Sequence, residues 1–343
     1  MEYRKWTGLV AATIAAVATA GTDVVPAPAP TPQEVEPGVW MIPGGMRPNR
    51  QPDGNSVIFD ASSGLVVVDT GRHAWHREAI LELAKSQKKD VVAVVNTHWH
   101  LDHVSGNPAL RAAFPELLVY ASNAIDGALS GFLAKSAGNA ATYLDDPEIA
   151  EEMRDDIRGD LATIRNGAAL RPDVVVTASG STTLGGRVLR INLAPDAATS
   201  GDVWLYDERT RVAVLGDLVT LPAPFLDTAC PEGWRVALGQ VAETDFQVAI
   251  PGHGPAMSRA QFLTYLEAFE AFIACSNSAG PRDVCASGWA ESVQPLLGDD
   301  PLERTRAQGF AAYYVEMLRA HEGRSEYCES QPDAHGTSPV QMH

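Results

Sequence analysis

Short apolar runs separated by turn residues divide the first part of the chain into predicted strands and one helix. Runs rich in β-branched residues and bounded by Gly, Pro and Asn occupy 39–43, 55–61, 64–71 and 90–98. Between the last two runs, apolar residues recur at helical spacing over 74–87. A buried strand followed by a helix and a second buried strand predicts an α/β sheet.

The pattern turns helical over about 121–170 and then returns to strands. The stretch 145–169 is strongly acidic on one face, which is typical of a helical face in solvent. A helical insertion that covers a functional site is the alternative interpretation. Strands are predicted again over 173–178, 187–194, 201–208, 211–219 and 246–255, and helices over 259–276 and 304–320.

The N-terminal residues resemble an export signal. Arg4 and Lys5 precede an apolar run over 8–20, which ends in small residues that suit a cleavage site. This run is shorter than the about 20 residues that span a bilayer. We therefore expect a cleaved signal peptide over 1–20, with an Ala-rich helix as the alternative, and a periplasmic or secreted protein without a membrane span. The Pro/Ala-rich segment 21–38 is predicted to be a disordered linker.

Composition narrows the class of partner. Of the 343 residues, 45% are hydrophobic and 20% are charged, as in ordinary soluble globular proteins. The 26 basic and 43 acidic residues give a net charge of −17, which argues against nucleic acid as a partner because a polyanion would be repelled. A small-molecule substrate is the expected partner.

The four cysteines lie in the C-terminal third of the chain. An exported protein meets an oxidising compartment, in which disulfides persist. Cys275 and Cys285 flank a loop with Gly and Pro that can bring them together, so a disulfide between them is predicted. Cys230 and Cys328 are the remaining pair and the weaker prediction. None of the spacings is that of a zinc–thiolate site.

Three of the nine histidines fall within the stretch NTHWHLDHVSG. His98 and His100 are two positions apart at the end of a predicted strand, where side chains at i and i+2 point to the same side. Asp102 and His103 follow beyond the strand end and are free to turn toward a second ion. Imidazoles together with a carboxylate are typical zinc ligands, so a metal site is predicted here.

The stretch THWHLDH resembles the H-x-H-x-D-H signature of the metallo-β-lactamase fold superfamily. Three further segments resemble superfamily motifs and occur in the superfamily's order: VVVDTG over 66–71, LGDLV over 215–219 and IPGHGP over 250–255. The resemblance spans roughly residues 39–270 and implies an α/β fold built as a four-layer αββα sandwich. The helical residues of about 121–170 would then be an insertion, and residues 271–343 a C-terminal helical extension with the predicted disulfide.

The resemblance also implies a two-zinc site with seven residues. They comprise ligands to a first ion, ligands to a second ion, one carboxylate that bridges both and one that orients the ligands. His98 and His100 would hold the first ion, and Asp102, His103 and His253 would hold the second. Asp217 would bridge both ions, and Asp69 would orient the ligands. Asp102 would also accept a proton from the attacking water, which makes it the expected catalytic residue.

One position departs from the superfamily pattern. The third histidine of the first metal site comes from a segment like H-T-x-G-D, and the matching stretch here is ATSGD, so Ala198 stands at the histidine position. Asp196 or His73 could supply the missing ligand, His73 because it follows VDTG at the strand end that faces the site. Alternatively, the protein binds a single ion at the second site, or the centre is a relic. We expect the second site to bind more tightly and the first to fill weakly or through His73.

The expected activity is zinc-dependent hydrolysis. Zinc lowers the pKa of a bound water from about 15.7 to about 7, and the hydroxide would attack an ester, lactone, thioester or amide-type small molecule. Phe225 and Trp234 follow Asp217 in the chain and are candidate walls of the substrate pocket. The motifs also resemble a periplasmic branch of the superfamily, whose members are named quinoprotein-relay or glyoxalase-like hydrolases.

Three other functions stay open. The first is an exported metallo-β-lactamase, although β-lactamases commonly carry Cys or Ser at the position of Asp217, and Ala198 also departs from their pattern. The second is a mononuclear iron oxygenase, which metal identity and oxygen consumption would reveal. The third is a non-catalytic metal-binding accessory protein, which would turn over no ester, lactone, thioester or β-lactam.

Overall fold

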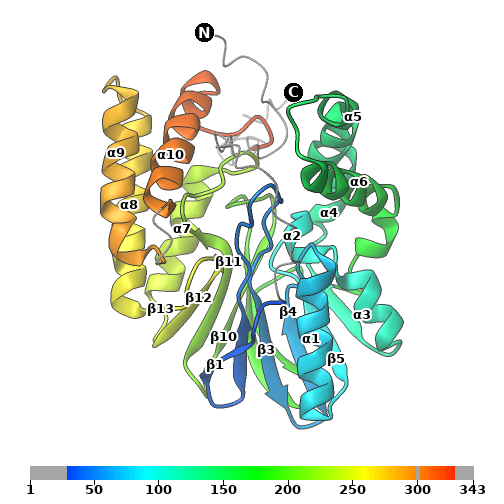
Figure 1. Ribbon diagram of the computed structural model, residues 1–343. Helices are drawn as coiled ribbons and strands as arrows, with labels where there is room; N and C mark the ends of the chain where they lie inside the picture. The colour runs from blue at the N-terminus through cyan, green and yellow to red at the C-terminus, as the bar shows by residue number, and fades with distance from the viewer. Residues whose placement is uncertain (1–28, 299–301, 329–343) are drawn as a thin grey trace, which may run out of the picture.

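The computed structural model describes residues 29–298 and 302–328 (Figure 1). The predicted signal peptide over 1–20 and the first part of the predicted linker lie outside these residues. Within the described ranges, no helix combines the length and the apolar character needed to span a bilayer. The strands form two sheets: one contains the strands before the helical stretch and the short strand directly after it, and the other contains the later strands.

The first sheet has seven strands in the order β1-β2-β3-β4-β5-β6-β7. Its strands are β1 (Gln33–Glu36), β2 (Val39–Ile42), β3 (Ser56–Ala61), β4 (Gly64–Val68), β5 (Val91–Val95), β6 (Leu118–Ala121) and β7 (Val174–Val175). Strands β1 to β4 pair antiparallel and β4 to β7 pair parallel. Parallel neighbours need crossover connections. These are α1 (Ala74–Gln87) before β5, and α2 (Leu101–Val104) and α3 (Asn107–Ala113) before β6.

The second half forms a six-stranded sheet in the order β13-β12-β11-β10-β9-β8. Its strands are β8 (Gly180–Leu184), β9 (Arg187–Ala194), β10 (Asp202–Asp207), β11 (Val212–Thr220), β12 (Val248–His253) and β13 (Met257–Ser258). The β11–β12 pair is parallel and is connected through α7 (Pro231–Ala242), whereas the other pairs are antiparallel.

Alternating side chains in the strands build three apolar layers. In β4, Val66 and Val68 pack against the second sheet, while Leu65 and Val67 pack against α1. On the outer face of the second sheet, Trp204 of β10 packs with the C-terminal helices. The order helix, sheet, sheet, helix confirms the predicted four-layer αββα sandwich.

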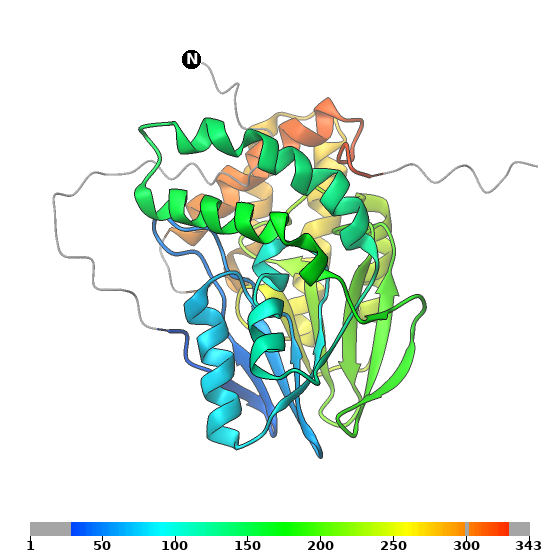
Figure 2. The same cartoon turned by 90° about the vertical axis from the view of Figure 1, so that its right-hand side faces the viewer.

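The segment between β6 and β7 is helical, as the sequence predicts. It contains α4 (Ala124–Ser130), α5 (Phe132–Leu144), α6 (Glu151–Arg165) and the short 3₁₀ helix η1 (Gly167–Leu170). Figure 2 shows α5 and α6 lying over one end of the strands. On the solvent side of α6, Arg158 pairs with Glu151 and Asp155. The opposite side packs on α5 through Ile157 and Leu161, so one face of α6 is solvated and the other is buried against α5.

Helices after β13 cover the outer face of the second sheet. They are α8 (Arg259–Ser276), α9 (Arg282–Val293), the 3₁₀ helix η2 (Gln294–Leu296) and α10 (Glu303–Ala320). Disulfides Cys275–Cys285 and Cys230–Cys328 are both present, which confirms the two predicted pairs. The second disulfide ties the residue just before α7 to the chain that follows α10.

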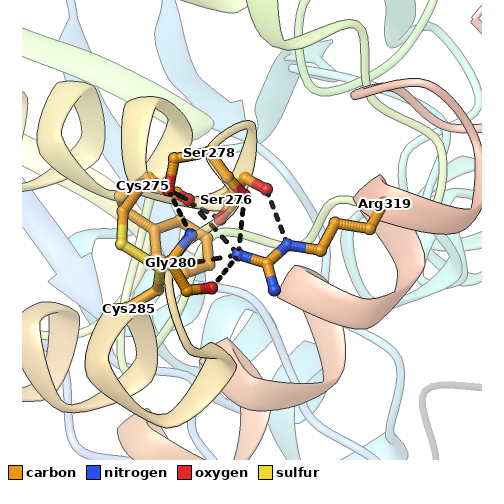
Figure 3. The surroundings of a disulfide bond; sticks show 7 residues. Cys275, Ser276, Ser278, Gly280, Cys285 and Arg319 are labelled. Carbon is orange, nitrogen blue, oxygen red and sulfur yellow. Dashed lines mark hydrogen bonds between the residues drawn. A yellow bond between two sulfur atoms is a disulfide. The ribbon is translucent and has the colours of Figure 1, made fainter.

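Arg319 of α10 closes the disulfide-bridged loop between α8 and α9 (Figure 3). Its guanidinium donates hydrogen bonds to the carbonyl oxygens of Ser276 at 3.0 Å, Ser278 at 3.0 Å and Gly280 at 2.8 Å. Carbonyls at the end of a helix lack partners within the helix. One side chain therefore provides hydrogen-bond donors for three carbonyl oxygens at the end of α8 and in the loop that follows it, and joins α10 to that loop.

Some element boundaries differ from the predictions. The predicted linker 21–38 ends in a strand, because Gln33–Glu36 pair with β2 along the sheet edge. The predicted strand 90–98 ends at Val95, since the backbone N–H of Thr97 bonds the Asp69 carboxylate instead of a neighbouring strand. The apolar pattern does not predict β8, because its residues GSTTL are polar and mostly exposed.

Candidate metal centre

The predicted site residues lie at the carboxyl ends of the parallel strands in both sheets. They are Asp69 after β4, His98 and His100 after β5, Asp102 and His103 in α2, Asp217 in β11 and His253 at the end of β12. Loops after parallel strands share one edge of a sheet, and such edges are the usual place of ligand sites in α/β folds. His98 and His100 come after the end of β5, so the loop rather than strand alternation orients them.

Five of these side chains converge on one buried volume. Nε2 of His103 lies 3.3 Å from Nε2 of His253 and 3.2 Å from Oδ1 of Asp217. Nε2 of His253 lies 3.1 Å from Oδ2 of Asp102. On the other side of the Asp217 carboxylate, Oδ2 lies 3.4 Å from Nε2 of His98. Asp217 therefore stands between two groups of nitrogen and oxygen ligands.

These residues form two groups that could hold a metal ion. Within each group the ligand atoms lie within 4.8 Å of one another: His98, His103 and Asp217 in one, and Asp102, His103 and His253 in the other. His100 stands beside the first group, with Nδ1 3.7 Å from Oδ2 of Asp217. The geometry thus brings all six predicted ligands together from both sheets and α2.

Unpartnered polar atoms in this volume fit a bound cation. Nε2 of His98 and both carboxylate oxygens of Asp217 are buried and form no hydrogen bond with any described residue. Buried polar atoms are almost always satisfied by hydrogen bonds or ions, because leaving one unpaired costs about 1–3 kcal/mol or more. Imidazole nitrogens with carboxylate oxygens form the donor set that zinc prefers. The residues therefore fit a zinc ion.

Asp69 orients two of the candidate ligands. Its Oδ2 accepts hydrogen bonds from Nδ1 of His103 at 2.8 Å and from the hydroxyl of Thr97 at 2.7 Å. Since the Thr97 hydroxyl donates to Asp69, it accepts from Nδ1 of His98, which lies 2.9 Å away. Both imidazoles are thereby fixed with Nε2 directed into the ligand cluster, which is how carboxylates support metal-bound histidines.

Electrostatics around the cluster favour positive charge. Burial alone lowers the pKa of His103, but the carboxylates of Asp217, Asp69 and Asp102 outweigh it and raise the pKa well above its ordinary value. Burial, assisted by the charge of His103, lowers the pKa of His98 to about 4, so that imidazole is neutral. A metal ion and a proton compete for the same nitrogen. The negative potential that attracts the proton to His103 would equally attract a divalent cation.

The two residues predicted as replacement ligands lie outside both groups. Both ring nitrogens of His73 face carboxylates other than those of the cluster: Nδ1 lies 2.8 Å from Oδ2 of Asp53 and Nε2 lies 3.1 Å from Oδ1 of Asp156. Asp196 is half-buried in the loop before β10, and its carbonyl packs so closely on Gly233 that a Cβ there would come within 2.0 Å. Among the described residues, neither belongs to a metal-binding group.

A cavity of about 100 Å³ opens beside the cluster. His100 and Asp102 line it together with side chains of α5 and α6, so the helical insertion covers the candidate centre. Phe225, a predicted pocket residue, lines the cavity, with its ring centroid 5.4 Å from that of His253. Trp234 does not line it. Its indole is fully buried and donates to the carbonyl of Leu218, so the pocket prediction for Trp234 is wrong, and the residue belongs to the core.

The hydrophobic pattern and the motifs of the sequence do not identify several residues of the site. Gly54 and Gly252 approach the ligands so closely that a Cβ would come 2.3 Å from the His103 ring and 2.0 Å from Oδ1 of Asp217. Asp202 is buried beside Asp217; burial and the Asp217 charge raise the pKa of its carboxyl well above the ordinary value. These positions depend on contacts between distant segments, which a linear pattern does not record.

Comparison with known proteins assigns the family. The sequence profile described as "Metallo-beta-lactamase superfamily" matches residues 50–260, which is more than half of the chain. The chain belongs to the metallo-beta-lactamase superfamily. This membership agrees with the αββα sandwich and with the position of the ligand cluster at the strand ends.

Relatives within the superfamily differ in their printed activities. The chain is 24% identical over 300 residues to a linear primary-alkylsulfatase of a Pseudomonas species, covering 80% of this chain and 54% of that protein. It is 41% identical over 75 residues to a hydroxyacylglutathione hydrolase of Nostoc punctiforme, covering 22% of this chain and 28% of that protein. The chain thus spans about half the length, or less, of these two relatives.

Solved structures of the superfamily share the fold. The stereoselective inverting sec-alkylsulfatase Pisa1 from Pseudomonas sp. superposes with a TM-score of 0.58 at 21% identity, covering 88% of this chain and 52% of that chain. The metallo-beta-lactamase FIM-1 from Pseudomonas aeruginosa, in its mono-zinc form, gives a TM-score of 0.51 at 20% identity, covering 71% and 96%. At these identities the likeness concerns the fold alone.

Ala198 is the position at which the sequence predicts that a histidine ligand is missing. Ala198 is fully buried, and its carbonyl accepts a hydrogen bond of 2.9 Å from the Thr228 hydroxyl. Because that hydroxyl donates to Ala198, it accepts from Nε2 of His100, which lies 3.0 Å away. Thr228 therefore orients His100 in the region where the superfamily pattern expects a third imidazole, and His100 is left with Nδ1 facing Asp217.

Proposed function

We propose that this chain is a metal-dependent hydrolase of small-molecule substrates and that its metal is zinc. The observation that supports this most is the buried, unpartnered set of ligand atoms on His98 and Asp217. The similarity to an alkylsulfatase and to a hydroxyacylglutathione hydrolase supports hydrolysis as the reaction class. Those activities belong to the relatives.

The chain's own residues have distinct roles in this proposal. Asp102, His103 and His253 would hold one zinc, His98 and His100 would hold another, and Asp217 would contact both. When bound, zinc supplies a water of lowered pKa and polarises the oxygen that gains negative charge. Asp102 lines the cavity, so its carboxylate lies within reach of a substrate and is our candidate proton acceptor.

We propose that the group of Asp102, His103 and His253 binds the metal more tightly. With Asp217 it provides two imidazoles and two carboxylates, which is one protein ligand more than His98, His100 and Asp217 provide for the other ion. The group of His98 and His100 lacks a third imidazole because position 198 is alanine. We therefore expect one tightly held zinc for each chain and a second that dissociates more readily.

For the substrate we propose an ester, lactone, thioester or other activated acyl or sulfate ester. Sulfate esters and thioesters are the bonds that the printed names of the relatives suggest. The two disulfides support function in an oxidising compartment, such as the periplasm or the exterior, where such bonds persist.

Metal analysis together with a substrate panel tests this function. The purified chain is loaded with zinc, its metal content is measured, and esters, lactones, thioesters, alkyl sulfates and nitrocefin are assayed. We expect His103→Ala to lose the tightly held zinc and roughly 100-fold or more in turnover, while His321→Ala, at the exposed position that directly follows α10, changes neither. Full metal content and full activity in His103→Ala would contradict the proposal, and turnover of nitrocefin alone would favour a β-lactamase.

A further inference from the structure

We infer that the cavity under the helical insertion binds an uncharged apolar portion of the substrate, an alkyl or acyl chain or an aryl group. The hydrolysable bond would lie at the end where His100 and Asp102 reach the cavity. This inference rests on the proposed hydrolase function, which it deepens by naming the substrate class. It makes α5 and α6 the elements that determine specificity.

The walls of the cavity are mainly hydrocarbon. Phe132 and Ala137 line it from α5, Leu161 and Ile164 from α6, and Trp99 from the loop that carries the candidate ligands. The ring centroids of Trp99 and Phe132 lie 5.6 Å apart, so these two aromatic side chains form one continuous wall. Concave sites with mostly apolar walls and a few polar groups at one end are typical of small-molecule binding sites.

Among the described residues that line the cavity, no cationic side chain remains available to bind an anionic portion of a substrate. Arg72 is the one cationic side chain among the described residues that line it. Its guanidinium is hydrogen-bonded to Asp160 and lies 3.7 Å from Asp102, so its charge is neutralised. Asp227 adds a further carboxylate, which accepts hydrogen bonds from two tyrosine hydroxyls at 3.1 and 2.7 Å. Burying a second anion here would be unfavourable, so the bound portion is uncharged.

Hydrogen bonds and an ion pair hold α6 in place over the cavity. On the inner side of α6, Asp156 accepts a hydrogen bond of 2.8 Å from the backbone N–H of Gln51, and Asp160 accepts one of 2.8 Å from the Gln51 side chain. Asp156 also pairs with Arg50 at 2.9 Å. These contacts join α6 to the loop before β3, so the cavity is formed before a ligand arrives. A preformed cavity spares the ligand the cost of ordering its walls.

Small side chains on α5 set the length of the cavity. Ala137 lines it and is half-buried, so a larger side chain at this position would occupy space that is otherwise open to a ligand. Ala141 lies one turn further along the same helix, is exposed and does not line the cavity. Ala137→Phe is therefore a blocking variant, and Ala141→Phe is its matched control. Leu161→Ala on α6 is the reciprocal variant, which enlarges the cavity.

Binding of straight-chain alkan-1-ols tests the cavity without requiring turnover. Titration calorimetry on the zinc-loaded full chain is carried out with butanol to decanol. We expect the affinity to rise roughly three- to fourfold for each added methylene, the gain typical of burying a CH₂ group, until the chain fills the cavity, and to level off for longer chains. Ala137→Phe should weaken decanol binding by roughly tenfold or more, Ala141→Phe should leave it unchanged, and Leu161→Ala should move the preference to longer chains.

Hydrolysis of p-nitrophenyl esters from acetate to decanoate gives the second readout. We expect kcat/KM to follow the same dependence on chain length, and a terminal carboxylate on the acyl chain to abolish the gain. Length-dependent alkanol binding without any ester hydrolysis would support the cavity and contradict the hydrolase. Hydrolysis with no length dependence in either assay, or equal effects of Ala137→Phe and Ala141→Phe, would overturn the cavity inference and leave the hydrolase standing. If Ala137→Phe does not fold, the effect of Leu161→Ala on chain-length preference tests the cavity inference.

Discussion

Oδ2 of Asp69 accepts a hydrogen bond of 2.8 Å from Nδ1 of His103. The same carboxylate receives the backbone N–H and the hydroxyl of Thr97, and through that hydroxyl it fixes the ring of His98. One side chain at the end of β4 therefore sets the orientation of two imidazoles that follow β5. The parallel pairing of β4 and β5 brings these strand ends together.

Asp69→Asn should weaken metal binding by roughly 10- to 100-fold, because it removes one acceptor and the negative charge behind the His103 ring. Asparagine tolerates the positive φ of 60° at this position, so the backbone is preserved. Zinc affinity measured by competition with a chelator checks the effect. Asp90→Asn, at an exposed position, is the control. Equal zinc affinity in the two variants would show that Asp69 does not support the ligands.

Thr228→Val should weaken the more loosely bound zinc by roughly tenfold and leave the tightly bound one unchanged. The hydroxyl is the partner of Nε2 of His100, whereas the group of Asp102, His103 and His253 makes no use of it. Titration of the apo chain with zinc resolves the two binding steps. Thr183→Val, on the exposed strand β8, serves for comparison. Loss of the tight step would mean that Thr228 acts on the whole cluster.

His73→Gln should leave the zinc content unchanged, because both ring nitrogens of His73 already face carboxylates. The variant should instead destabilise the fold in a pH-dependent way. Burial alone lowers the pKa of His73, but hydrogen bonds to Asp156 and Asp53 outweigh it and raise the pKa. A raised pKa in the folded state adds stability below the unfolded value of about 6.5, and this is lost as the pH rises through the folded value.

The free energy of unfolding of the wild type and of His73→Gln is therefore compared at about pH 5.5 and about pH 8.5. We expect the larger difference at the lower pH. The residual difference at the higher pH reflects the lost stacking of His73 on Trp75, whose ring centroids lie 4.0 Å apart. His321→Gln, at an exposed position, is the matched control. A fall in zinc content in His73→Gln would restore His73 as a metal ligand.

Removal of the two disulfides should have unequal effects on stability. Cys230 and Cys328 are 98 residues apart, whereas Cys275 and Cys285 are 10 residues apart. In the chain-entropy description, closing a loop of about 100 residues contributes about 4.7 kcal/mol and a loop of about 15 residues about 3 kcal/mol. Denaturant unfolding of the two double Cys→Ser variants measures this. A greater loss for the 275–285 pair would contradict it and point to the Arg319 contacts as the main stabiliser of that loop.

Much of the fold follows from local patterns. The helices over 74–87 and 259–276 begin and end as predicted, because apolar spacing and flanking residues determine such boundaries locally. The strand β1 escapes prediction, since the residues QEVE become a strand only by pairing with β2. The strand ending at Val95 is shorter than its apolar run because a distant carboxylate, Asp69, takes the backbone N–H of Thr97.

The sequence by itself determined the donor set of the candidate centre and the order of its motifs, because ligands at strand ends are encoded in short contiguous stretches. Only the tertiary structure decided that His73 faces Asp53 and Asp156, that Trp234 belongs to the core, and that α5 and α6 cover the cavity. Each of these depends on which distant segments pack together. That choice is made by burial and charge pairing across the whole fold, which no short stretch of sequence contains.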